Sequence, residues 1–223
     1  MTVTAPARQA GVHVRRTQSE RRESTQLKIL EAAINILQER GFASATMQEI
    51  AREAGVTPGA LQHHFGSKEA LVEFIIESVF RDAGAGGLAW PDADLALDPR
   101  AAQFVDRAWK SIYGRPAYLA SWQLHLGVQD TPALSRLLDT RRLRWEEIHV
   151  ELFLSSFPEL RAHCADPIGM ATLVFSSLRG MGLLALFTGT ARVINRQRAA
   201  LAAVISAAGA PAKGSSTIPR SRP

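Results

Sequence analysis

Two adjacent pairs of side chains have the residue types that metal binding or nucleophilic catalysis requires. His63 is followed by His64, and His163 is followed by Cys164. Neighbouring residues on a helix diverge by about 100°, so His63 and His64 cannot chelate one metal ion together. His163 and Cys164 have no CxxC, HxxxH or acidic partner at the spacing of metal ligands. We therefore expect no catalytic residue, no metal site and no cofactor, and we interpret Cys164 as an ordinary loop or core residue.

A second group of side chains combines apolar rings with polar tips, the mixture that lines pockets for small apolar molecules. Its members recur at helical spacing on two segments that flank residues 114–116. They are Trp109, Tyr113, Tyr118, Trp122, His125 and Gln129. We predict that these residues line a ligand pocket. The alternative is that they only fill the core.

Two short helices joined by a tight turn are predicted in the N-terminal third of the chain. Thr46 is an N-cap residue with Glu49 at the capping-box position, and Gly55 ends this first helix. Thr57 followed by Pro58 begins the second helix. Helices of this length and spacing have the dimensions of a helix-turn-helix unit, whose second helix enters the major groove of DNA.

The other elements are also predicted to be helical, because apolar residues recur at spacings of three and four and alternating strand patterns are absent. A helix over residues 26–40 should end at Gly41 in a left-handed conformation. A helix over residues 67–80 is apolar on more than one face and should contact both halves of the protein. After a glycine- and proline-rich junction over residues 82–99, helices are expected over residues 99–113, 116–128, 131–156, 166–188 and 191–208.

The helix over residues 166–188 is the most apolar part of the chain. Arg179 interrupts it, and a charge at the centre of a bilayer costs about 2.5 to 3.5 kcal/mol on insertion scales. We therefore expect no membrane span. We predict a helix buried nearly all round, packed within its own subunit and against a second one.

The net charge of +5 is concentrated in the two terminal segments. Residues 1–26 carry five arginines and two glutamates, and residues 209–223 carry three basic residues and no acidic one. We expect basic disordered arms over residues 1–23 and 209–223, which would suit a polyanion such as DNA or only keep the termini solvated. A single cysteine and the lack of an apolar leader predict a reducing, cytoplasmic setting.

A set of short motifs spans residues 24–75 and includes the predicted helix pair. The motifs are Ile29-Leu30-Glu31-Ala32-Ala33, Gly41-Phe42, Thr46, Ile50-Ala51, Ala54-Gly55-Val56-Thr57, Gly59-Ala60-Leu61, His64-Phe65 and Lys68-Glu69-Ala70-Leu71. This run resembles the N-terminal signature of the TetR family of transcriptional regulators. The resemblance implies an all-α fold, with a three-helix helix-turn-helix domain over residues 24–80 and a larger helical ligand-binding and dimerisation domain over residues 81–208.

The resemblance also implies which residues approach the DNA backbone. Thr46 and Lys68 stand at family positions that touch phosphates, one from a helix N-terminus and one as a point charge. The first turn of the second helix should face the bases. That turn consists of Thr57, Pro58, Gly59 and Ala60. The small side chains at Gly59 and Ala60 predict a close approach of the backbone to the DNA.

Base reading is then expected from side chains that can donate or accept hydrogen bonds. They are Gln48, Thr57, Gln62 and His63, and glutamine can bridge N6 and N7 of adenine. His64 should reach either bases or backbone. Gln62 stands where the family usually has tyrosine, so either its amide replaces the usual phosphate contact or the register of this helix in the groove differs.

Together these features predict a homodimeric, ligand-responsive repressor that binds a pseudo-palindromic double-stranded DNA operator. A small, largely apolar or aromatic effector should release it. An activator or a ligand-independent regulator of the same fold is an alternative, because the sign of regulation depends on where the operator lies. An all-α enzyme using the aromatic pocket is a further alternative, but the chain lacks a nucleophile with a base, paired carboxylates and a phosphate-binding loop.

Overall fold

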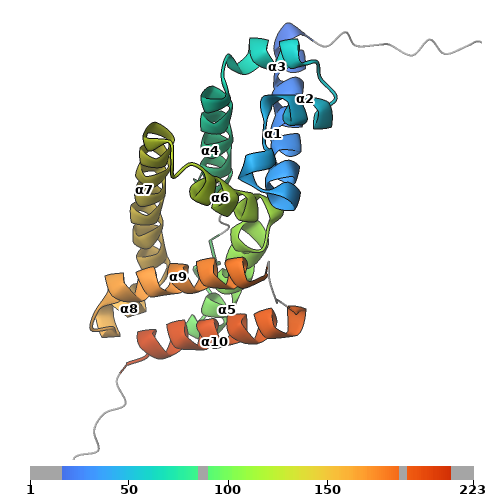
Figure 1. Ribbon diagram of the computed structural model, residues 1–223. Coiled ribbons are helices and arrows are strands. Elements are labelled where there is room, and N and C mark those ends of the chain that lie inside the picture. The colour runs from blue at the N-terminus through green and yellow to red at the C-terminus, as the bar shows by residue number, and fades with distance from the viewer. Residues whose placement is uncertain (1–16, 85–89, 186–189, 212–223) are drawn as a thin grey trace, which may run out of the picture.

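The computed structural model describes residues 17–84, 90–185 and 190–211, and every regular element in these ranges is helical (Figure 1). The first half contains α1 (Gln18–Arg40), the short 3-10 helix η1 (Phe42–Ser44), α2 (Met47–Glu53), α3 (Pro58–Phe65) and α4 (Lys68–Gly84). The second half contains α5 (Leu97–Ala108), η2 (Trp109–Tyr113), α6 (Pro116–Gly127), α7 (Pro132–Ser156), α8 (Pro158–His163), α9 (Pro167–Ala185) and α10 (Ala191–Gly209). The prediction of an all-α fold is confirmed.

Helix α1 begins at Gln18, so the start expected at residue 26 is wrong. Thr17 caps the helix, because its hydroxyl accepts from the backbone N–H of Glu20 at 3.2 Å and the Glu20 carboxylate accepts from the N–H of Thr17 at 2.7 Å. This reciprocal pair satisfies two backbone donors that would otherwise lack a helical partner. The last six residues of the arm expected over residues 1–23 are therefore helical, and residues 1–16 lie outside the described ranges.

The N-terminal core is the cluster of buried side chains that holds α1 to α4 together. Its members from these helices include Ile29, Ile36, Ile50, Leu61 and Ile75, all at most 2% exposed. The same cluster contains Ala120, Leu124 and Val128 of α6 and Leu134 and Leu138 of α7. The DNA-binding half expected to end at residue 80 is thus completed by two helices from the second half.

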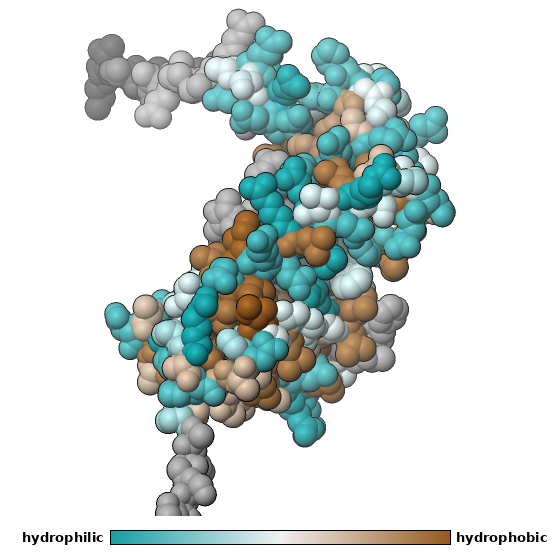
Figure 2. Space-filling model, turned by 90° about the vertical axis from the view of Figure 1, so that its left-hand side faces the viewer, coloured by the Kyte–Doolittle hydropathy of each residue, from teal (hydrophilic) through white to brown (hydrophobic). Residues whose placement is uncertain are grey.

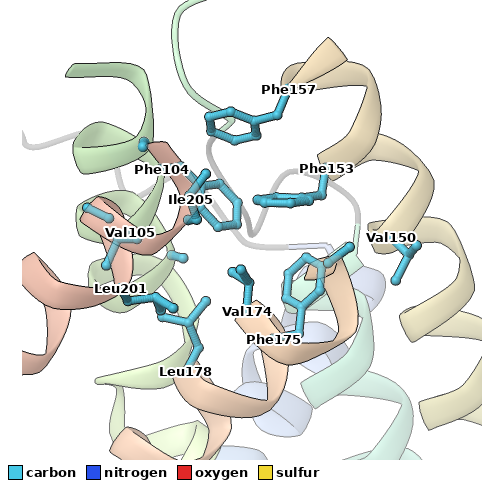
Figure 3. Close-up of a cluster of buried hydrophobic side chains, with 14 of the residues drawn as sticks. Phe104, Val105, Val150, Phe153, Phe157, Val174, Phe175, Leu178, Leu201 and Ile205 are labelled. Carbon is cyan, nitrogen blue, oxygen red and sulfur yellow. The ribbon is translucent and has the colours of Figure 1, made fainter. Parts of the chain in front are cut away.

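The C-terminal core lies between α5, α7, α8, α9 and α10. Phenylalanine rings from three helices meet at its centre (Figure 3). The centroid of the Phe104 ring of α5 lies 5.0 Å from that of Phe153 of α7 and 6.1 Å from that of Phe175 of α9. Leu201 and Ile205 of α10 close one side. Ion pairs support these contacts at the surface, including one between Asp106 of α5 and Arg198 of α10.

Two local features were not predicted. Residues 158–163 form the short helix α8, which Pro158 begins. Residues 109–113, expected as the end of a regular α-helix, form the π-helical segment η2, in which the Gly114 N–H donates to the Trp109 carbonyl at 2.8 Å. Single π-turns often occur at functional sites.

Helix α9 is long and apolar enough to cross a membrane by length and composition, but it packs against the C-terminal core through Ala171, Val174, Phe175 and Leu178. Only 33% of its most apolar 18-residue stretch is buried within the chain. The burial on nearly all sides that the sequence predicted is therefore not reached by a single subunit. Leu173 and Leu184 remain about half exposed, at 53% and 49%.

Candidate DNA-binding surface and ligand cavity

Helices α2 and α3 form a bent pair at one end of the molecule, far from α9 and α10 in the view of Figure 1. Ile50 and Ala51 of α2 and Leu61 of α3 are buried, which fixes the packing of the two helices. Gly55 makes the turn with a φ of 66°, and the N–H of Val56 donates to the Ala51 carbonyl at 3.0 Å. The helix-turn-helix geometry predicted for this segment is therefore present.

Both helices of the pair are capped by threonine. The hydroxyl of Thr46 accepts from the Glu49 N–H at 3.2 Å, and that of Thr57 accepts from the Ala60 N–H at 3.1 Å. Because a hydroxyl has one donor besides its acceptor sites, each threonine keeps a free O–H to offer to a phosphate or a base. Capping thus holds both hydroxyl groups in place at the exposed ends of the helices.

The capping box expected at Thr46 is only half formed. Instead of returning to the Thr46 N–H, the Glu49 carboxylate accepts from Arg52 at 2.8 Å and from Arg40 at 2.9 Å. These guanidinium groups, with Arg52 dominant, lower the pKa of Glu49. Two nearby arginines are therefore neutralised within the protein and are poor candidates for phosphate binding.

All ten residues predicted to contact DNA lie at the surface. Seven are exposed: Thr46, Gln48, Thr57, Pro58, Gly59, Gln62 and His63. The other three are partly buried: Ala60, His64 and Lys68. The face of α3 opposite Leu61 is thus open to a ligand along its first two turns, and this end of the molecule is mainly hydrophilic on the face that Figure 2 shows.

Gln62 has a structural contact that the sequence did not reveal. Its side-chain amide N–H donates to the carbonyl of Gly66, which follows α3 with a φ of 71°. The contact satisfies a carbonyl at the C-terminal end of the helix. To bridge N6 and N7 of adenine, Gln62 must first release this carbonyl.

His64 lies beside the N-terminal turns of α1. Its pKa is lowered, first by burial and then by the charge of Arg22 and the neighbouring His63. A lowered pKa keeps the His64 imidazole neutral near pH 7. The same proximity brings Arg22, expected in a disordered arm, onto a helix next to the end of α3, so Arg22 is a further candidate for phosphate contact.

Lys68, the first residue of α4, has its ammonium group 4.8 Å from the centre of the Phe42 ring. No carboxylate within the described ranges pairs with it. The ring holds the cation in place without neutralising it. Lys68 is therefore able to bind a phosphate.

A cavity of about 160 Å³ lies where the two halves of the protein meet. Its wall draws on α1 (Leu30, Ile34), α4 (Ser78), η2 (Ser111, Ile112, Tyr113), α6, α7 and α9. The wall is mostly apolar. Because α1 and α4 belong to the first half of the chain, a molecule in this cavity would touch both halves directly.

The structure brings together four of the six residues predicted to bind a ligand. Tyr113, Tyr118, Trp122 and His125 line the cavity. Trp109 does not, because its indole packs beside Gly114, where an added Cβ would lie 2.6 Å from Nε1. Gln129 also lies outside, since it is exposed and its amide donates to the His125 carbonyl at 3.4 Å.

The polar tips in the wall are buried and lack hydrogen bonds of good geometry. They are the hydroxyl groups of Tyr113 and Tyr118 and the indole nitrogens of Trp122 and Trp145. Burial raises the pKa of Tyr113 well above its usual value and that of Tyr118 to about 12, although the nearby Trp122 N–H and Arg179 oppose the shift at Tyr118. Both hydroxyl groups therefore stay protonated at neutral pH.

Sequence reasoning missed the charged part of the wall. Arg115, Arg142 and Arg179 line the cavity, and Glu146 lies against it, 3.2 Å from Arg142 and 3.5 Å from Arg179. One signal was available, because Arg179 is a lone charge in an apolar helix and such a residue usually points to a polar partner inside the fold.

Trp145 also lines the cavity, and its ring stacks on that of His149 with a centroid distance of 3.8 Å. In the described part of the chain, no group of three histidine, cysteine or acidic side chains is placed to hold a metal ion.

An exposed second helix of a helix-turn-helix pair, on a helical body with an internal cavity, is the arrangement expected of a DNA-binding regulator of the helix-turn-helix class. Residues 29–75 match the family described as bacterial regulatory proteins, tetR family. The N-terminal part of the chain is thus similar to the DNA-binding segment of TetR-family regulators.

Curated relatives and solved structures show the same similarity. The HTH-type transcriptional regulator UidR of Escherichia coli K12 is 48% identical over 54 residues, which cover 24% of this chain and 28% of UidR. The HTH-type transcriptional regulator CymR of Pseudomonas putida is 27% identical over 181 residues, covering 78% of this chain and 85% of CymR. The match to UidR thus spans little more than a quarter of that protein.

The fold extends the similarity to most of the chain. A transcriptional regulator from Rhodococcus sp. Rha1 superposes with a TM-score of 0.65 at 16% identity, covering 81% of this chain and 95% of the other. The multidrug binding protein EbrR in complex with imidazole superposes with a TM-score of 0.52 at 22% identity, covering 80% and 93%. The helical second half, which lies outside the matched family segment, is therefore also of this fold.

Proposed function

We propose that the protein is a repressor that binds a pseudo-palindromic operator as a homodimer and is released by a small, largely apolar or aromatic effector. The observation that carries the proposal is the pairing of an open α3 with a cavity whose wall includes α1 and α4. In this proposal the exposed helix α3 binds DNA, and the cavity gives a ligand access to α1 and α4, the helices that position α3. The division at residue 80 into a DNA-binding part and an effector part, with basic arms at both ends, belongs to this proposal.

In the proposed complex, α3 enters the major groove with its N-terminal turn against the bases. The free O–H of Thr57 and the side chains of Gln48 and His63 read base edges, and the backbone at Gly59 approaches the DNA closely. Thr46, Lys68 and His64 contact the backbone. Neutralisation of phosphates by Lys68 and the arms makes binding fall steeply with salt.

The proposed dimer forms through α9 and α10. Along α9, the exposed residues Leu173, Ser176, Gly180 and Leu184 recur at spacings of three and four and so share one face. Along α10, Val193 and Val204 are 48% and 42% exposed. Pairing these helices with their two-fold mates would bury this apolar surface and set two α3 helices one DNA turn apart, about 34 to 36 Å.

Helix α4 connects the cavity to the DNA-binding surface. Ser78 lines the cavity, Glu77 pairs with Arg141 of α7, and Leu71 and Ile75 lie in the N-terminal core next to α3. A ligand that shifts α4 would change the separation of the two α3 helices. A coupling of about 1 to 3 kcal/mol would weaken operator binding roughly 5- to 150-fold.

The proposal includes a cytoplasmic location, where the DNA and a reducing environment are found. The single cysteine, Cys164, is a free thiol in the structure, which suits such a setting. The described arrangement of α9, with Arg179 paired to Glu146, favours a helix packed in protein rather than in lipid.

The test is selection of bound fragments from the host genome with the full chain, followed by binding measurements on the recovered sequence. A Thr57→Ala, Lys68→Ala double variant should bind at least about 10-fold more weakly, because it loses a base contact and a phosphate contact. Lys110→Ala is the matched control, since Lys110 is 72% exposed on α5 and pairs only with Asp106 within the described ranges. Unchanged binding by the double variant, or a monomer at micromolar concentration, would contradict the proposal.

A further inference from the structure

The wall of the cavity selects for the charge of the ligand as well as its shape. We propose that the effector is an aromatic or apolar molecule that carries an anionic group of the carboxylate type. This inference rests on the proposed function, because it takes the cavity to be the effector site.

The first argument is the charge of the wall. Three guanidinium groups line the cavity, those of Arg115, Arg142 and Arg179, and none of the lining residues that the structure describes is acidic. Glu146 forms ion pairs with two of these arginines: its carboxylate oxygens lie 3.2 Å from a guanidinium nitrogen of Arg142 and 3.5 Å from one of Arg179. Arg115 has no ion-pair partner within the described ranges. Arg115 is exposed and the Arg142 side chain is 43% exposed, whereas the Arg179 side chain is only 21% exposed. The wall therefore carries an excess of positive charge, partly desolvated at Arg179, where a cationic ligand is repelled and an anion is stabilised.

The second argument is the kind of hydrogen-bonding groups in the wall. The indole N–H groups of Trp122 and Trp145 are buried and can only donate; that of Trp145 lacks a partner within the described ranges, and that of Trp122 has only the Tyr118 hydroxyl nearby, without good hydrogen-bond geometry. Guanidinium groups also only donate, and the buried hydroxyl groups of Tyr113 and Tyr118 keep their protons. A buried donor without an acceptor costs free energy. A ligand rich in acceptor oxygens, such as a carboxylate, satisfies these donors.

The third argument concerns the rest of the ligand. Leu30, Ile34, Ile112 and Leu138 supply apolar parts of the wall, and the indole rings of Trp122 and Trp145 supply flat surface. A ring system fits this lining, and its carboxylate reaches the arginines. Arg179 of α9 is the more enclosed of the two arginines that pair with Glu146. Its side chain is 21% exposed, and that of Arg142 is 43% exposed.

The experiment compares three probes that share one ring system and differ only in charge: 1-naphthoate, 1-naphthamide and 1-naphthylmethylammonium. Binding to the full chain is followed by calorimetry and by the fluorescence of the tryptophans in the wall. We expect 1-naphthoate to bind about 10- to 100-fold more tightly than the amide, the range for charge-assisted hydrogen bonds, and the ammonium compound to bind most weakly.

Two variants move this selectivity in opposite directions. Arg179→Gln should remove most of the preference for the carboxylate, whereas Glu146→Gln should strengthen 1-naphthoate binding, because it removes the internal anion that competes for Arg142 and Arg179. Arg144→Gln, an exposed position on the same helix as Arg142, is the matched control and should change nothing. Circular dichroism checks that each variant is folded.

The inference is overturned if the amide or the ammonium compound binds as tightly as 1-naphthoate, if none of the three binds at millimolar concentration, or if Glu146→Gln weakens the carboxylate. Operator binding is measured on the same preparations. A chain that binds its operator without this selectivity overturns the inference alone. A chain that prefers the carboxylate but binds no DNA overturns the proposed function instead.

Discussion

Leu124 of α6 tests whether the first half of the chain, α1 to α4, depends on the second half for its core. Its side chain is 1% exposed and lies in the cluster that holds α1 to α4 together. Truncation of a buried leucine to alanine removes the transfer free energy of the lost groups and leaves a cavity, at a cost of about 2 to 5 kcal/mol. We expect Leu124→Ala to lower the free energy of unfolding by that amount.

The matched control lies two residues further along the same helix. Leu126 is 62% exposed, so Leu126→Ala should change stability by no more than about 0.5 kcal/mol. Urea unfolding followed by circular dichroism measures both variants, and the slope of free energy against urea should stay the same while the midpoint shifts. A loss below about 1 kcal/mol for Leu124→Ala would refute the view that α6 completes the N-terminal core.

Three further predictions concern α3 and the cavity. Thr57→Ala should destabilise the protein by about 1 kcal/mol because α3 loses its N-cap, whereas Thr57→Ser keeps the capping hydroxyl and should not. Thermal unfolding measures both variants, and equal effects of the two would contradict a capping role. Gly59→Ala meets no atom within 4 Å and should raise stability by at most about 1 kcal/mol, yet it should weaken operator binding in an anisotropy assay if the DNA approaches the backbone there. The only two tyrosines, Tyr113 and Tyr118, both have a raised pKa in the folded chain, so absorbance at alkaline pH should show no tyrosinate near pH 10 until urea is added. Because the unfolded chain releases these protons first, the folded state should lose stability from about pH 10 upward, and a tyrosine that ionises normally in the folded protein would contradict its burial.

The helix-turn-helix could be predicted closely from sequence because its signals are local. Thr57 with Pro58 begins α3, Gly55 makes the turn, and both act within a few residues of where they stand. The start of α1 was missed although Thr17 and Glu20 form a capping box, because the charged residues that follow them have no apolar periodicity. Capping and turn residues thus predict that a helix is present more reliably than they predict the residue at which it begins.

The cavity could be predicted only in part. The aromatic stripe indicated four of its residues, but the wall also takes side chains from helices that are far apart in sequence, such as Leu30 and Arg179. Spacing along one helix contains no information on which other helix will face it. Trp109, the first residue of the π-helical segment η2, has its indole beside Gly114 and outside the cavity wall, which helical spacing alone did not indicate.

The central claim is that α3 reads the major groove as one of a pair of helices. Methylation interference on a recovered operator fragment tests it directly, because methylation at guanine N7 blocks contacts in the major groove. We predict two interfering clusters on one face of the duplex, one helical turn apart, where each α3 helix enters the major groove. A single cluster, or interference confined to the minor groove, would contradict the account.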